Sequence, residues 1–111
     1  MDLVTLYKCL GDPTRLRILN LLREGSLCVC QLQEALEESQ VKMSKHLGYM
    51  RKRGLLVSER IANWSYYKIN PAAHPMLKAN MKALSSFAAK DDEFASDLKR
   101  LKEVKSHADC P

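Results

Sequence analysis

The sequence contains no hydrophobic run that approaches the roughly 20 residues of a membrane-spanning helix. Its first residues, MDLVTLYKCLGD, also lack the basic segment and the cleavage site of a secretory signal. We therefore expect a cytoplasmic protein without a membrane partner, in which thiols are kept reduced. A disulfide framework is then not expected, and the four cysteines are left with metal binding, redox sensing or burial as roles: Cys9, Cys28, Cys30 and Cys110.

The sequence also lacks the usual marks of an enzyme. It has no Cys-x-x-Cys in a βαβ pattern, no phosphate-binding loop, and no Ser-His-Asp or paired-carboxylate arrangement. We expect a protein that is not an enzyme, which would bind a ligand stoichiometrically rather than turn it over. There is no repeat, low-complexity segment or long linker, so the 111 residues predict a single domain, 1–111. The net charge of +5 suggests an acidic partner such as nucleic acid.

Apolar residues spaced three and four apart predict helices in the first half of the chain. A short first helix covers residues 3–10, and a core helix with Asp12 as N-cap and Pro13 at its first position follows. Two further helices come close together, one over 27–38 capped by Ser26 and one that begins at Ser39 and ends at Gly54. Their short connection predicts a helix-turn-helix.

After Gly54 the apolar period changes to two, which predicts strands. LLVSERI and SYYKI form a hairpin with its turn at Ala62 and Asn63, and this wing spans residues 55–69. Helical spacing then returns over residues 72–106. The predicted fold class is α+β and mainly helical: a winged helix-turn-helix with additional helices at both ends, available for dimerisation.

The segment from Ser39 to Ser58 has five basic residues and no acidic one. Amide and hydroxyl groups read base edges in the major groove, while Lys and Arg neutralise phosphates. We expect the helix within this segment to read DNA, with the wing touching the backbone or the minor groove. The alternatives are a merely solvated basic helix, or a winged helix that binds only protein and has no salt-dependent DNA affinity. The candidate DNA contacts are Gln40, Lys42, Ser44, Lys45, His46, Tyr49, Arg60, Asn63 and Trp64.

Four segments of the chain together resemble the ArsR-type (arsenical-resistance) winged-helix repressors: YKCLGDPTRLRILNLL, LCVCQL, SQVKMSKHLGYMRKRGLL and NWSYYKIN. The resemblance implies a homodimer that represses a resistance operon and leaves its operator when it binds a metal or metalloid ion. It also implies that Gln40, Ser44 and His46 lie on the operator-reading helix. Val41 stands where proline is common in the family, and valine is tolerated in a first helical turn.

The helices at the two ends of the chain are the predicted dimerisation elements, residues 1–10 and 72–106. Each has an apolar face that the central domain need not cover. An operator with two half-sites also requires a two-fold symmetric protein. The alternative is that both helices fold back onto the core of their own chain.

Cys28 and Cys30 lie in LCVCQL, and the resemblance to arsenic-sensing members implies that they bind the inducer, As(III) or Sb(III). Soft thiolates suit such soft ions. In a regular helix, residues two apart point about 200° away from each other. Ion binding is therefore expected to unwind or bend the first turn of this helix, which packs against the reading helix and would displace it from the operator.

A three-coordinate site needs a third ligand, and the chain has Gln33 where some members of the family have another cysteine. Cys110 in the tail is one candidate and Cys9 the other, although Cys9 also suits burial. A two-thiolate site completed by water or an exogenous thiol is equally open.

Two other kinds of sensor remain possible from the sequence. Cys28 and Cys30 would serve equally in a repressor of the same fold that senses oxidants or persulfides. A zinc or cadmium sensor is less favoured, because those ions take four ligands and often use His. The three histidines, His46, His74 and His107, do not cluster in the sequence, although His107 lies near Asp109 and Cys110.

Overall fold

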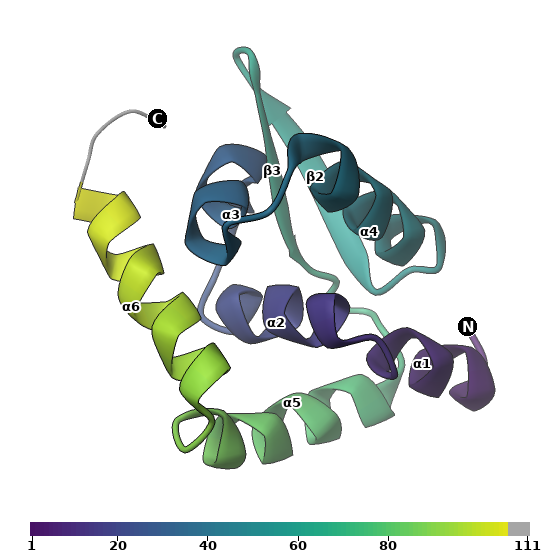
Figure 1. Ribbon diagram of the computed structural model, residues 1–111. Coiled ribbons are helices and arrows are strands. Elements are labelled where there is room, and N and C mark those ends of the chain that lie inside the picture. Colours follow the sequence, from purple (N-terminus) through teal and green to yellow (C-terminus); the bar gives the residue numbers. More distant parts are fainter. Residues whose placement is uncertain (107–111) are drawn as a thin grey trace.

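The computed structural model describes residues 1–106, which form six helices and a three-stranded sheet (Figure 1). In chain order the elements are α1 (Leu3–Leu10), α2 (Pro13–Leu22), β1 (Leu27–Cys28), α3 (Val29–Leu36), α4 (Gln40–Lys52), β2 (Leu56–Ile61), β3 (Trp64–Ile69), α5 (Pro75–Ala88) and α6 (Asp92–Ser106).

Two of the helix starts predicted from the sequence are confirmed by their caps. Asp12 accepts a hydrogen bond from the Arg15 N–H at 3.1 Å, and Ser39 accepts one from the Lys42 N–H at 3.2 Å. Each side chain satisfies one of the backbone donors that a helix leaves unpaired in its first turn. The α2 and α4 helices therefore begin where local sequence places them.

The predicted start of α3 is wrong. Ser26 does not cap this helix, because Leu27 and Cys28 form the short strand β1, opposite Tyr67 and Tyr66 of β3. The α3 helix begins at Val29, with Cys28 as its N-cap residue in an extended conformation. Pairing with β3 satisfies the backbone of β1 and buries both side chains, so a distant strand overrides the local helical pattern.

The sheet has the strand order β1-β3-β2 and is antiparallel throughout. Ile61 lies opposite Trp64 at the end of the hairpin, and the turn residue Ala62 has a positive φ of 55°. In Figure 1 the tip of this hairpin projects beyond α3 and α4. The β1 strand joins the wing to the start of α3, an arrangement that the sequence did not predict.

The helix-turn-helix packs on one apolar core. Met43, Leu47 and Met50 of α4 are fully buried, as are Leu32 and Ala35 of α3. These residues belong to the same buried cluster as the apolar side of α2. The mainly helical α+β fold with a winged helix-turn-helix is confirmed.

The terminal helices differ in how much of their apolar surface the chain itself covers. Leu98 and Leu101 of α6 pack against the core, and α6 lies beside α3 and α2. Side chains on α1 and α5 remain open, with Val4 64% and Phe87 69% exposed. Across the described residues, no helix has the length and apolar character to span a membrane.

Candidate DNA-reading surface and thiol site

The α4 helix turns a polar face outward. Gln40, Lys42, Ser44 and Lys45 are exposed, on the side opposite the buried methionines and leucine of the same helix. Lys42 pairs with Glu38 in the turn that precedes the helix, at 3.2 Å. The exposed face therefore combines amide, hydroxyl and ammonium groups, the chemistry that base edges and phosphates require.

His46 is only partly exposed. Burial lowers its pKa, while the charge of nearby Asp12 acts in the opposite direction. The imidazole therefore favours its neutral form near pH 7.

Two arginine side chains lie close to the ring of Tyr49. The guanidinium of Arg15 lies 4.1 Å from the ring centre and that of Arg53 lies 3.5 Å from it. Arg15 also donates to the Cys9 carbonyl at the end of α1, at 2.9 Å. Such cation–π contacts are stabilising, and here they connect α1, α2 and α4. The ring acts as a support within this fold.

The wing carries the remaining predicted contacts. Arg60 is exposed near the end of β2, Asn63 is exposed in the turn, and Trp64, which begins β3, is 37% exposed. These wing side chains and the polar face of α4 are all exposed to solvent, and they belong to one unit made of the helix-turn-helix and the hairpin. That unit offers two separate elements to a DNA duplex.

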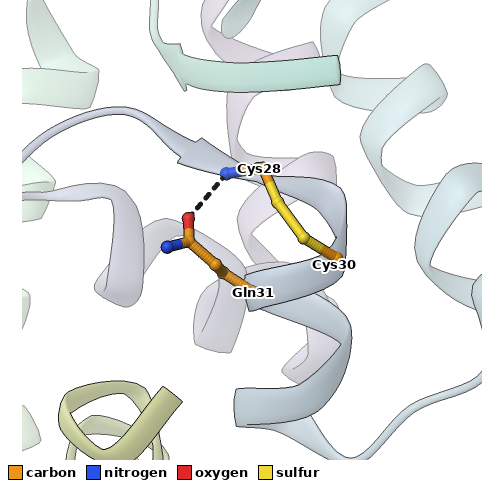
Figure 2. The surroundings of a disulfide bond; sticks show 3 residues. All are labelled: Cys28, Cys30 and Gln31. Carbon is orange, nitrogen blue, oxygen red and sulfur yellow. Dashed lines mark hydrogen bonds between the residues drawn. A yellow bond between two sulfur atoms is a disulfide. The ribbon is translucent and has the colours of Figure 1, made fainter. Parts of the chain in front are cut away.

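Cys28 and Cys30 are bonded to each other at the start of α3 (Figure 2). Cys28 is fully buried and Cys30 partly exposed, and their Cα atoms lie 5.4 Å apart. Cys28 has the extended φ and ψ angles of −79° and 156°, whereas Cys30 is in the first turn of the helix. The predicted absence of a disulfide is therefore wrong for this pair.

The expectation that an ion must unwind the helix depended on both cysteines being helical, and that premise is wrong. With Cys28 outside the helix, the 200° separation does not apply. The two sulfur atoms meet while α3 is regular from Val29 to Leu36. A pair of thiols on this backbone can face one small electrophile or one ion without loss of the first turn.

The backbone around Cys28 is held from two directions. Its N–H donates to the side-chain oxygen of Gln31 at 3.0 Å, one half of a capping box (Figure 2). As part of β1 the residue also lies opposite Tyr66 of β3. A change at the two sulfur atoms therefore acts on the wing strand and on α3 together.

The described residues do not bring a third ligand to this pair: among residues 1–106 no three His, Cys, Asp or Glu side chains are grouped as a metal site. Cys9 is a free, fully buried thiol, and burial raises its pKa, against the opposing charges of Arg15 and Arg53. Because the thiolate is the form that binds metals, this environment disfavours Cys9 as a ligand. Cys110, with His107 and Asp109, lies outside the described residues.

The histidines have separate roles in the structure. His74 is the N-cap of α5 and accepts a hydrogen bond from the Met76 N–H at 3.1 Å, while His46 lies on α4. Neither is grouped with the cysteine pair within the described part of the chain.

Sequence reasoning missed several supporting residues. Gln31 was not detectable, because its place at the third helical position depends on α3 beginning at Val29, which the pairing of β1 with β3 decides. The stacking of Arg15 on Tyr49 left no signal in the sequence, since the two residues belong to different helices.

Comparison with known proteins identifies relatives of this sequence. The family described as "Bacterial regulatory protein, arsR family" matches residues 12–58. The "Arsenic resistance transcriptional regulator ArsR1" of Pseudomonas putida is 39% identical over 106 residues, covering 95% of this chain and 81% of that protein. The "Arsenical resistance operon repressor" of Escherichia coli is 46% identical over 69 residues, or 61% of this chain and 59% of that protein.

Solved structures agree with the fold. The homodimeric winged helix-turn-helix DNA-binding domain of Mb0332 from Mycobacterium bovis superposes with a TM-score of 0.65 at 25% sequence identity. The match covers 76% of this chain and 78% of that one. These relatives are transcriptional regulators and not enzymes, in agreement with the missing catalytic motifs.

Proposed function

The chain belongs to the ArsR family of bacterial transcriptional regulators, and we propose that it is a homodimeric repressor released from its operator by As(III) or Sb(III) bound to Cys28 and Cys30. The observation that carries this proposal is the meeting of the two sulfur atoms at the start of α3. This helix packs directly against the reading helix α4. A repressor of an arsenical resistance operon is what the Escherichia coli relative's name describes.

Operator binding uses the polar face of α4 and the tip of the wing. Gln40 and Ser44 are the side chains for base edges, and Lys42 and Lys45 are those for phosphates. His46, partly exposed on the same helix, joins them in facing the operator, while Tyr49 holds α4 through its contact with Arg15 of α2. Arg60, Asn63 and Trp64 extend the contact to the neighbouring groove.

Two reading helices are needed for two half-sites, and α1 and α5 provide the surface for a dimer. Exposed apolar side chains gather on this pair of helices: Leu3, Val4 and Tyr7 on α1, with Met76 and Phe87 on α5. The Mb0332 domain is named as homodimeric, which supports a two-fold assembly here. Leu98 and Leu101 of α6 pack against the core of their own chain, and the most exposed apolar side chains lie on α1 and α5, so we place the centre of the interface on α1 and α5.

The cysteine pair suits a trivalent metalloid because soft thiolates suit soft ions. Two sulfur donors come from the reduced pair, and a third comes from Cys110, from water or from an exogenous thiol. Both sides of the junction between β1 and α3 then respond, since Cys28 pairs with the wing strand and Cys30 belongs to the helix. An inducer that binds the DNA-free form about 10⁴-fold more tightly would move the population from mostly bound to mostly free.

Fluorescence anisotropy of labelled promoter DNA tests this proposal. As(III), Sb(III), Cd(II), Zn(II) and peroxide are titrated in turn into the complex of DNA with the reduced protein. We expect release by As(III) or Sb(III) at stoichiometric amounts, and no release by Zn(II) alone. Release only by Cd(II) or Zn(II) would identify a sensor of those ions, and absence of DNA binding in every condition would refute the repressor.

A salt titration of the same complex distinguishes a lysine that contacts a phosphate from one that only adds to the net positive charge of the protein. Lys45→Ala should lower the slope of log K against log salt concentration by about one unit. Lys102→Ala removes another exposed lysine, on α6 and away from the reading helix, and serves as the matched control.

The Cys28–Cys30 disulfide favours a second candidate, a repressor that responds to oxidants. Peroxide would take two electrons and two protons from the two thiols and leave as two molecules of water, with the sulfur–sulfur bond formed. Release by peroxide in a metal-free buffer, reversed by dithiothreitol, would support this function. The same experiment without release would leave the metalloid as the inducer.

A further inference from the structure

Asp97 belongs to α6, and its side chain is fully buried on the inner side of this helix. Two arginines bind its carboxylate. Arg17 of α2 donates from Nε at 2.9 Å and from Nη2 at 2.8 Å, so both carboxylate oxygens are engaged. Arg100, one turn further along α6, donates from Nη2 at 2.8 Å. Bidentate arginine–carboxylate pairing is geometrically specific. We call Asp97, Arg17 and Arg100 the arginine clasp.

The clasp also reaches the C-terminal end of α3. Arg100 Nε donates to the Ala35 carbonyl at 2.7 Å, and Arg17 Nη2 donates to the Leu36 carbonyl at 3.2 Å. These carbonyls belong to the last turn of the helix, where acceptors have no partner within the helix and the helix dipole attracts cations. Two positive side chains therefore cap the C-terminal end of α3, and their bonds to Asp97 fix the orientation of both.

The same two arginines contact the turn that leads into the reading helix. Arg100 pairs with Glu37 at 3.3 Å, and Glu37 has a positive φ of 53° that ends α3. Arg17 lies 3.9 Å from Glu38, which in turn pairs with Lys42 of α4 at 3.2 Å. An unbroken chain of ion pairs thus runs from α6 through the turn to the first turn of α4.

We propose that Asp97 is a positioning residue for operator binding: through Arg17 and Arg100 it fixes the end of α3 and the direction in which α4 enters the DNA groove. The α6 helix is then part of the DNA-binding machinery, although its own side chains touch no DNA. A buried carboxylate with two cationic partners is costly to disturb, because removing one charge leaves the remaining buried charges only partly compensated. The α3–α4 turn is therefore held in one geometry.

This inference rests only on operator binding, and not on the identity of the inducer. If the wild-type protein fails to bind DNA, the proposed function fails. If the wild type binds and the clasp variants bind equally well, this inference alone fails.

The test compares operator affinity and thermal stability in the full-length dimer. Asp97→Asn keeps the size of the side chain and removes its charge, and Arg100→Gln removes one partner that is 29% exposed at its side chain. We expect both variants to raise the operator Kd at least tenfold below their melting temperatures. The neighbouring Lys99→Gln, at an exposed position on α6, should stay within twofold of wild type.

A purely stabilising role is separated from positioning by a second control. Leu22→Val loosens the core at the C-terminal end of α2 and removes no group of the clasp, the dimer surface or the reading helix. At an equal loss of melting temperature, it should keep wild-type operator affinity. Positioning is overturned if Leu22→Val loses as much affinity as the clasp variants, or if folded Asp97→Asn binds within twofold of wild type. If Asp97→Asn does not fold, Arg100→Gln decides by the same criterion.

Discussion

The two ends of α3 are held by different chemistry. At the N-terminal end, Cys28 and Cys30 are joined to each other, and Cys28 is paired with the wing strand β3. At the C-terminal end, Arg17 and Arg100 cap the last carbonyls and are themselves fixed by the buried Asp97. The first end consists of thiol chemistry that a soft ion or an oxidant can change. The second consists of permanent charges that no such ligand alters.

This difference indicates a division of roles along one short helix. In a helix of eight residues, an anchored end gives a change at the other end a fixed point to act against. The arginine clasp supplies the anchor, and the thiol pair supplies the variable contact. Between them, Leu32 and Ala35 face the buried core that α3 shares with α4.

The largest expected effect comes from removing the variable end. In Cys28→Ala with Cys30→Ala, the metalloid concentration for half-release from the operator should rise by about 100-fold or more, equivalent to about 2.8 kcal/mol of lost coupling. Operator affinity without inducer should stay within threefold. Anisotropy titrations measure both quantities. Cys9→Ala is the matched control and should release normally, whereas loss of release there would move the sensor to Cys9.

A substitution in the middle of α3 should lower the stability of the fold rather than the response to the inducer. Leu32→Ala leaves a cavity in the core and should lower the free energy of unfolding by about 2–5 kcal/mol. Urea denaturation followed by circular dichroism measures it. Glu34→Ala, exposed on the same helix, should change the value by less than about 0.5 kcal/mol. Similar losses in the two variants would contradict the packing assigned to Leu32.

The cap at the N-terminal end makes a smaller contribution. Gln31→Ala deletes the acceptor for the Cys28 N–H and should cost about 1 kcal/mol of stability. Hydrogen exchange of the Cys28 amide should also become faster. Gln31→Glu keeps an acceptor oxygen and should restore both values, so failure of this rescue would argue against the capping box.

The smallest effect concerns pH. Burial lowers the pKa of His46 in the folded protein, so protons bind more readily to the unfolded chain. Its stabilising contribution is present above the unfolded pKa of about 6.5 and is lost as the pH falls below that value. Between about pH 7 and pH 5, the stability of His46→Gln should therefore fall less steeply than that of wild type. Urea denaturation across this range measures both slopes, with Lys45→Gln as the control, and equal slopes would contradict the assignment.

Local patterns predicted most of the elements. The caps Asp12 and Ser39, the buried faces of α2 and α4, and the hairpin at residues 55–69 all depend on neighbours within a few positions. The family and the non-enzymatic function also followed from the sequence.

The errors occurred where distant residues decide the structure. LCVC is apolar enough for a helix or a strand, and pairing with Tyr66 and Tyr67 makes its first half a strand. That pairing moves Cys28 out of the helix and brings it to Cys30. The arginine clasp was equally hidden, because Arg17 and Asp97 lie at opposite ends of the chain.

Carbon chemical shifts of the reduced protein, recorded by NMR before and after addition of As(III), test the central claim most directly. The ion is proposed to lie between the two sulfur atoms at the start of an intact α3. Residues from Val29 to Leu36 should therefore keep helical shifts, while Cys28 and its partner Tyr66 in β3 change. Loss of helical shifts at Val29, Cys30 and Gln31 would mean that the ion unwinds the first turn and would contradict the account.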